Sequence, residues 1–240
     1  MASLDSLLTR QVLSKGVVRQ VLLDKAVGLR LRYIGSSTVT SVVVVQADSL
    51  VLTTAAKTDT FLFDDPTGGT PWYTTLGGLA DAINDTGRWE AKVVDALRSE
   101  DPDDFFLATS GTSSATTDEN GVVCYDLLID TSAAATIAAC LSPNGPNFDM
   151  PEGHRVHLKQ IDYIVDNTAA AGTLKIYKRK GSAERLVYSA INVDGSLTSV
   201  SWASGHGKIT GGPDEEIIVF FDGTVIDTLT QYVSLTGIYE

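Results

Sequence analysis

The sequence predicts a mainly β protein with minor α content: a small β-β-α-β module followed by a jelly-roll-like antiparallel β-sandwich. Three observations predict this class. Runs of β-branched and aromatic residues, such as residues 40–45 and 216–221, suit a pleated, half-buried surface. The 21 glycines supply the positive-φ positions that tight turns need. Only one stretch, residues 75–85, carries a clear helical stripe, and the 240 residues suit two domains.

The N-terminal segment, residues 1–20, is predicted to form a basic arm. Residues 3–15 carry apolar side chains at helical spacing, with Ser3 as the cap and Gly16 as the stop. Residues 1–35 have a net charge of +4, whereas the whole chain has −12, so the remainder carries −16. This asymmetry can indicate an arm that docks on an acidic partner, although a solvated basic face is the favoured interpretation. The arm hypothesis assigns partner binding to Arg10, Lys15 and Arg19.

Residues 21–108 are predicted to form the small α+β domain. Within residues 29–34, apolar side chains alternate with Arg30 and Arg32, which indicates a strand with one apolar and one basic face. A loop rich in Gly and Pro, residues 64–71, precedes the helix over 75–85, for which Thr75 is the N-cap candidate. Strands are predicted over residues 17–23, 29–34, 39–46, 49–53, 60–63 and 89–94.

Residues 109–121 have no periodicity and predict a linker, with the domain boundary near residue 115. The second domain, residues 122–240, has about eight short strands separated by turn signals, which is typical of a sandwich or jelly roll. No helical pattern of ten or more residues separates these strands, which argues against parallel βαβ units. The strands are predicted over residues 122–129, 136–140, 156–165, 173–177, 185–190, 197–202, 216–221 and 232–239.

No local spacing in the chain matches a catalytic or metal-binding motif, so we expect neither an enzyme nor a cofactor. His154 and His157 would point to opposite faces of a strand, and His206 lies in a glycine-rich loop. That loop, residues 205–212, lacks the spacing of a phosphate-binding loop and predicts a surface hairpin. The acidic pair at residues 64–65 and the acidic loop at residues 100–104 lack ordered calcium-ligand spacing. Cys124 and Cys140 lie in apolar stretches of the sequence, which predicts that both are buried thiols.

The charge and hydropathy exclude two classes of partner. A net charge of −12 disfavours a role in gripping nucleic acid, which needs clustered Lys and Arg. No apolar run reaches the roughly 18 residues that span a bilayer, and the N-terminus has no secretory pattern.

Two features suit recognition of a partner. Trp72 and Tyr73 follow the loop of residues 64–71 and can stack on a sugar or fill a partner pocket, although folding back over a core is the favoured interpretation. Lys178, Arg179 and Lys180 flank a turn at Gly181, where a basic tip can meet an acidic neighbour or simply be solvated.

Two stretches resemble accessory virion proteins of tailed bacteriophages. Residues 76–93, Leu-Gly-Gly-Leu-Ala-Asp-Ala-Ile-Asn-Asp-Thr-Gly-Arg-Trp-Glu-Ala-Lys-Val, look like a small β-β-α-β module of phage structural proteins. The second stretch is the pattern from Val156 to Glu240, whose closing Tyr-Val-Ser-Leu-Thr-Gly-Ile-Tyr at residues 232–239 is similar to the last strand of jelly-roll domains on phage heads and tails. The resemblance carries over no catalytic residue.

The resemblance implies a cement or decoration protein that binds the major capsid protein or other virion proteins and bridges capsomers. The chain is then a virion component, assembled in the host cytoplasm and homo-oligomeric, with a trimer favoured. Deleting residues 1–20 is expected to abolish capsid binding and leave the fold intact. The alternative is a tail or fibre component that recognises a host-surface glycan through Trp72 and Tyr73.

Overall fold

A computed structural model of the chain divides it into two compact units. Unit 1 joins residues 1–23 to residues 138–240, and unit 2 comprises residues 24–137. In sequence, unit 2 is therefore an insertion into unit 1. The structure describes residues 15–22, 26–35, 41–63, 72–103, 106, 115–117, 123–129, 136–141, 155–164, 173–191, 198–201, 209–212, 214–222 and 232–239.

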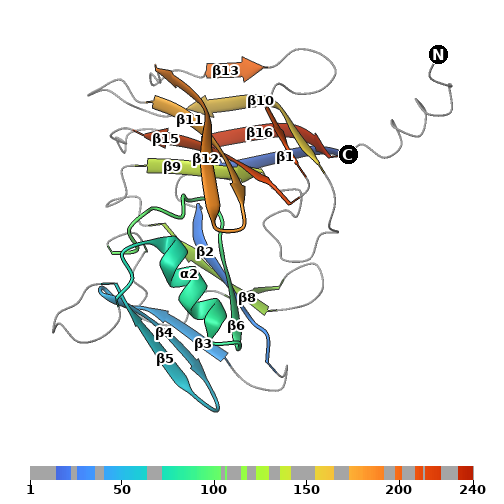
Figure 1. Cartoon of the computed structure of the whole chain (residues 1–240). Helices are drawn as coiled ribbons and strands as arrows, with labels where there is room; N and C mark the ends of the chain where they lie inside the picture. The colour runs from blue at the N-terminus through green and yellow to red at the C-terminus, as the bar shows by residue number, and fades with distance from the viewer. Residues whose placement is uncertain are drawn as a thin grey trace. The chain divides into compact units, whose positions relative to one another are not determined.

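The first sheet of unit 1 contains, within the described residues, β1 (Lys15–Leu22), β10 (Val156–Ile164), β13 (Thr198–Ser201), β14 (Ile209–Gly211) and β16 (Tyr232–Tyr239). Their order is β1-β16-β10-β13, and β14 also pairs with β10 (Figure 1). β1 pairs antiparallel with β16 along its whole length, from Lys15 opposite Tyr239 to Leu22 opposite Tyr232. β14 and β13 flank successive parts of the same edge of β10.

The second sheet of unit 1 has the order β12-β11-β15-β9, with β9 (Thr136–Leu141), β11 (Thr173–Lys180), β12 (Ala183–Ile191) and β15 (Glu216–Asp222). β11 and β12 form a hairpin whose two-residue turn begins at Gly181, where φ is +57°. Glycine adopts this left-handed conformation without steric cost, and such turns match the twist of paired strands. A register shift between Ile176 and Tyr177 makes Val187 an extra residue in β12.

The core of unit 1 is made of the alternating apolar residues of these strands. β15 is the exception to alternation, because residues 217–220, Ile-Ile-Val-Phe, are all buried, as expected of a strand covered on both faces. Each such side chain contributes about 1.5–3 kcal/mol when it is fully removed from water. The other buried apolar residues include Leu158, Ile161, Leu174, Ile176, Ile209 and Leu235.

The described residues of unit 2 form two antiparallel sheets. One has the order β6-β2-β8-β7, and the other has the order β3-β4-β5. The strands are β2 (Val27–Tyr33), β3 (Ser41–Val45), β4 (Ser49–Thr54), β5 (Thr58–Leu62), β6 (Trp89–Val93), β7 (Ala115–Thr117) and β8 (Val123–Leu128).

The helix of unit 2, α2 (Leu76–Asp85), packs beside β6 (Figure 1). Thr75 is its N-cap, as the sequence predicts, because the Thr75 hydroxyl accepts a hydrogen bond from the Gly78 N–H at 3.1 Å. At the other end, the Asn84 amide bonds both backbone groups of Ala91, at 2.7 Å and 3.1 Å. These two hydrogen bonds hold the end of the helix to the strand that follows. The buried face consists of Leu76, Gly77, Leu79, Ala80 and Ile83.

The mainly β class with antiparallel sheets and minor α content is confirmed. Several boundaries differ from those expected. β7 lies within the predicted linker of residues 109–121, and β8 pairs with β2, so residues 122–137 belong to unit 2. Residues 15–22 form a strand of unit 1 rather than the end of an arm. Residues 1–14, which contain most of the predicted helix, lie outside the described residues.

Candidate interaction surfaces

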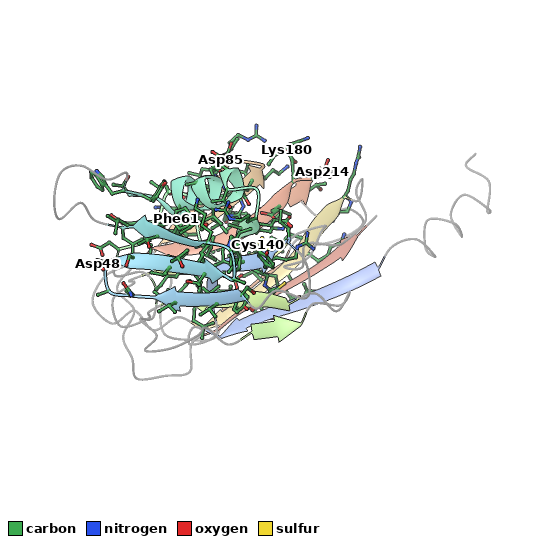
Figure 2. All side chains as sticks on the ribbon, turned by 90° about the horizontal axis from the view of Figure 1, so that it is seen from below. Asp48, Phe61, Asp85, Cys140, Lys180 and Asp214 are labelled. Atoms are coloured by element: carbon green, nitrogen blue, oxygen red, sulfur yellow. The ribbon has the colours of Figure 1, made fainter. Side chains whose placement is uncertain are left out.

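The tip of the β11–β12 hairpin presents fewer free cations than the sequence suggests. Lys180, labelled in Figure 2, is exposed beside the turn. The ammonium of Lys178 lies 3.8 Å from a carboxylate oxygen of Glu215. Arg179 is buried, with its side chain only 4% exposed, so it cannot contact a partner at the tip. The prediction that all three cations form one basic surface is wrong for Arg179.

Arg179 instead belongs to a buried ion-pair cluster. Its Nε donates to Glu216 Oε2 at 2.6 Å, and its Nη1 donates to Glu184 Oε1 at 3.3 Å. Its Nη2 also lies 3.9 Å from the Cys140 sulfur. Burial lowers the pKa of Arg179, but the charge and hydrogen bond of Glu216 together with the neighbouring charges of Cys140 and Glu184 outweigh burial, and the pKa is raised above its ordinary value. These strands meet in the second sheet of unit 1, so the cluster joins β9, β11, β12 and β15.

Two of the basic residues of the N-terminal third form ion pairs within unit 2. In unit 2, the guanidinium of Arg30 binds Asp126 through two hydrogen bonds of 2.5 and 2.6 Å across the β2–β8 pair. Arg32 pairs in the same way with Glu90 across the β2–β6 pair. The alternation of residues 29–33 is confirmed, but its basic face is neutralised by neighbouring carboxylates. The excess charge of residues 1–35 therefore does not all belong to an arm.

The three predicted arm residues have different places. Lys15 and Arg19 lie in β1, opposite Tyr239 and Leu235 of β16. Arg10 lies outside the described residues. Deleting residues 1–20 would remove most of β1, so the expectation that the fold survives this deletion does not agree with the β1–β16 pairing. A truncation that spares β1 must end at residue 14.

Trp72 and Tyr73 point in opposite directions from the edge of the β3-β4-β5 sheet. Trp72 forms a parallel bridge with Leu62 of β5, and the Tyr73 N–H donates to the Leu62 carbonyl at 2.9 Å. The Trp72 side chain is 49% exposed, whereas the Tyr73 ring packs against the buried Phe61 at 5.9 Å between centroids. The favoured interpretation that both aromatics cover a core holds for Tyr73 and is wrong for Trp72.

The N-terminus of α2 does not offer free donors to an anion. The Leu76 N–H donates to the Glu100 carbonyl at 2.8 Å, and the Gly77 N–H donates to the Arg98 carbonyl at 2.8 Å. Gly78 donates to the Thr75 hydroxyl. The first turn of the helix is therefore capped by its own unit. A side chain at Gly77 would approach the Arg98 carbonyl to 3.1 Å, which explains glycine at this position.

The residues considered for metal or acid–base chemistry are held in structural contacts. His157 is buried, with its Nδ1 2.9 Å from the Thr210 hydroxyl across the β10–β14 pair. Cys124 and Cys140 are both buried, and they lie in different units. His154, His206 and residues 64–65 lie outside the described residues. In the part of the chain that the structure describes, no group of three or more His, Cys, Asp or Glu side chains is placed to hold a metal ion.

A surface that the sequence analysis did not single out is the outer face of the β3-β4-β5 sheet. Cross-strand pairing places Val44, Val51 and Thr60 in one row. A second row consists of Val42, Thr53 and Thr58, and the bridge to Leu62 adds Trp72 at the edge. We call these residues the neutral face: Val42, Val44, Val51, Thr53, Thr58, Thr60, Leu62 and Trp72. None of them is charged, and all are at least partly exposed.

The charged residue of β5, Asp59, lies on the other side of this sheet. Asp59 of β5 is opposite the buried Leu52 and binds Arg88 at 2.5 Å and Lys57 at 3.0 Å. Burial raises the pKa of Asp59, but the hydrogen bonds from Arg88 and Lys57 outweigh burial and hold this pKa below its ordinary value. The carboxylate therefore stays ionised and paired on the inner side.

Comparison with known proteins does not assign the chain to a family. No family model matches the sequence, and no curated protein matches it either. Among the described residues, no helix has the length and apolar character that crossing a bilayer requires.

Proposed function

We propose that unit 1 is a jelly roll and that the chain is a structural virion subunit, a cement or decoration protein on the outside of a phage head. The observation that carries the proposal is the set of strand pairings in unit 1. Counted along the chain, with β13 and β14 as one interrupted strand, unit 1 has eight strands among its described residues.

These eight strands pair from the ends inward. The first pairs with the eighth (β1 with β16), and the second neighbours the seventh (β9 with β15). The third pairs with the sixth (β10 with β13 and β14), and the fourth pairs with the fifth (β11 with β12). A long antiparallel ribbon rolled into two four-stranded sheets has this pattern, so the pairing supports the proposal of a jelly roll.

The pairing supports a virion role because jelly rolls are common in capsid proteins. Fold alone does not determine function, so the two stretches that resemble phage proteins provide the second support. In the structure, residues 76–93 comprise α2, the Asn84–Ala91 contact and β6, and residues 232–239 are β16. β4, β5, α2 and β6 follow one another in the order of the expected β-β-α-β module, although β6 pairs with β2.

A cement protein stabilises a shell through many weak contacts repeated by symmetry. On this proposal, the chain binds the major capsid protein and bridges neighbouring capsomers. The protein performs no catalysis, and its location is the virion, assembled in the host cytoplasm.

Immunogold labelling tests this location. Antibodies against the purified chain are expected to label the heads of purified particles of the phage that encodes it. Label at the tail tip would replace the proposal with the tail alternative, and particles without label would contradict both.

A truncation tests the arm. A variant that lacks residues 1–14 keeps β1 and should keep the thermal unfolding temperature of unit 1, because the β1–β16 ladder is intact. If Arg10 and its neighbours grip the shell, we expect at least about a tenfold loss of binding to heads prepared without the protein, which is roughly 1.4 kcal/mol. Unchanged binding in a co-sedimentation assay would contradict the arm hypothesis and leave the rest of the chain as the contact.

The exposure of Trp72 favours a second candidate, recognition of a host-surface glycan. An indole that is half exposed can stack on a sugar ring. On this candidate, Trp72→Ala should abolish binding on a glycan array, while Trp72→Tyr should retain part of it. If no sugar binds the unmodified chain at millimolar concentration, this candidate fails.

A further inference from the structure

The neutral face differs from the corresponding face of the other sheet in unit 2. The outer face of the β6-β2-β8 strands carries Arg30, Arg32, Glu90, Lys92 and Asp126, four of which form cross-strand ion pairs. That face is therefore built from charged side chains that pair with one another across the strands. The neutral face belongs to the same unit, has the same pleated geometry and carries no charge at any of its eight positions. Solvation alone therefore does not explain its composition.

The chemistry of the neutral face is that of the centre of a protein–protein interface. Interface centres are depleted of charged residues and enriched in aromatic ones, and the interfaces between identical chains are the most apolar. Five of the eight residues of the neutral face are apolar, and its edge carries the half-exposed indole of Trp72. Because β-branched side chains lose little freedom on contact, ordering this face costs little entropy.

We propose that the neutral face is a contact between two copies of this chain. The argument for a second copy comes from charge. A chain with a net charge of −12 can attract a foreign, basic partner through its acidic surfaces. A face without charge contributes nothing to that attraction. Two identical chains repel each other at pH 7, so they meet at the least cost where neither presents a charge. This contact goes beyond the proposed function, because it holds whether the chain sits on a head or on a tail.

A two-fold axis through the neutral face would bring the same residues of both copies together. Two sheets packed in this way lie about 10 Å apart, with their strands within about 30° of each other. The central row, Val44, Val51 and Thr60, then lies at the middle of the contact, and Trp72 lies at its margin against the partner sheet. Such an isologous contact pairs copies two by two, so a dimer is expected in place of the trimer that the sequence favours.

Salt dependence provides the first test. The full-length chain is studied by sedimentation velocity over a hundredfold range of concentration, in about 50 mM and about 500 mM NaCl. Higher salt screens the repulsion between the two acidic chains, because the screening length falls to a few ångströms. We therefore expect the dimer dissociation constant to decrease at high salt. A dissociation constant that increases at high salt would overturn the proposal, because attraction between opposite charges would then hold the copies together.

A charged substitution provides the second test. Thr60→Glu places a carboxylate on an exposed position of the edge strand β5, where the fold tolerates it. The dimer should bring two such carboxylates close together, and we expect its dissociation constant to rise at least about tenfold. Ser99→Glu is the matched control, since it adds the same charge to an exposed position of unit 2 that is not part of the neutral face, and it should change the constant less than about twofold.

Trp72→Ala provides an independent variant at the margin of the contact. Removal of an aromatic anchor commonly weakens an interface about thirtyfold. Because the Trp72 indole is half exposed, we expect the Trp72→Ala variant to fold. Far-ultraviolet circular dichroism verifies that each variant is folded. A monomer at every concentration, or a dimer that Thr60→Glu leaves intact, would overturn the proposal. A monomer whose Trp72 fluorescence changes when a glycan is added would overturn it in favour of the glycan site.

Discussion

Replacing Arg179 with methionine is expected to lower the free energy of unfolding of unit 1 by about 3–5 kcal/mol. Glu216 lies 2.6 Å from the guanidinium and is itself buried, so its carboxylate would be left without its main cation. Glu184, 3.3 Å away, loses the same partner. A buried, uncompensated charge costs far more than the ion pair contributes to stability.

Urea denaturation measures this loss, and amide hydrogen exchange locates it on β11, β12 and β15. Lys180→Met is the matched control, because it removes a cation from the same strand at an exposed position, and it should change stability by less than about 0.5 kcal/mol. Removing the opposite charge as well, in the double variant Arg179→Met with Glu216→Leu, should restore at least half of the lost stability. If Arg179→Met changes the free energy of unfolding as little as Lys180→Met does, Arg179 is not buried in solution. The hairpin tip would then expose all three cations, as the sequence suggested.

Trp89→Ala is expected to lower the free energy of unfolding of unit 2 by about 3–5 kcal/mol. Trp89 is 1% exposed and makes edge contacts with Tyr33 and Tyr125, at centroid distances of 5.3 and 6.1 Å. Removing the ring leaves a large cavity where β6, β2 and β8 meet, and the two tyrosines lose their shared neighbour.

Trp89→Phe separates the loss of volume from the loss of the indole N–H. The Trp89 Nε1 is buried and has no hydrogen-bond partner among the residues that the structure describes. Phenylalanine removes this unsatisfied donor and leaves a smaller cavity, so we expect a loss of no more than about 1.5 kcal/mol. The loss is measured by chemical denaturation at two wavelengths of tyrosine and tryptophan fluorescence. A Trp89→Phe variant as unstable as Trp89→Ala would show that the N–H has a partner in solution.

The local elements were predictable because the signals that specify them are short-range. Alternation of apolar and polar residues identified β2 and β6, and the sequence around Thr75 identified the start of α2. β7 and β14, each of three residues, escaped prediction because three residues are too few to show a period. β11 extends to Lys180 although residues 178–180 are all basic, because Arg179 and Lys178 find acidic partners.

The pairing of the strands was not predictable in this way. Nothing in residues 15–22 indicates that they pair with residues 232–239, more than two hundred positions later, because the hydrogen bonds of a ladder are the same for every sequence. For the same reason, the sequence prediction assigned residues 122–129 to the second domain. In the structure these residues contain β8, which pairs with β2 of unit 2. The two-unit division with unit 2 inserted follows from these long-range pairings.

The sequence by itself determined that this is an acidic, mainly β protein, where most of its strands and its helix lie, and which of its motifs lack catalytic spacing. Only the tertiary structure decided which charges face solvent. Arg179, Arg30 and Arg32 look like surface cations in the sequence, and Trp72 looks like a core residue, because exposure depends on what lies across the sheet. The neutral face became visible for the same reason, since its residues come from three strands that only cross-strand pairing brings into register.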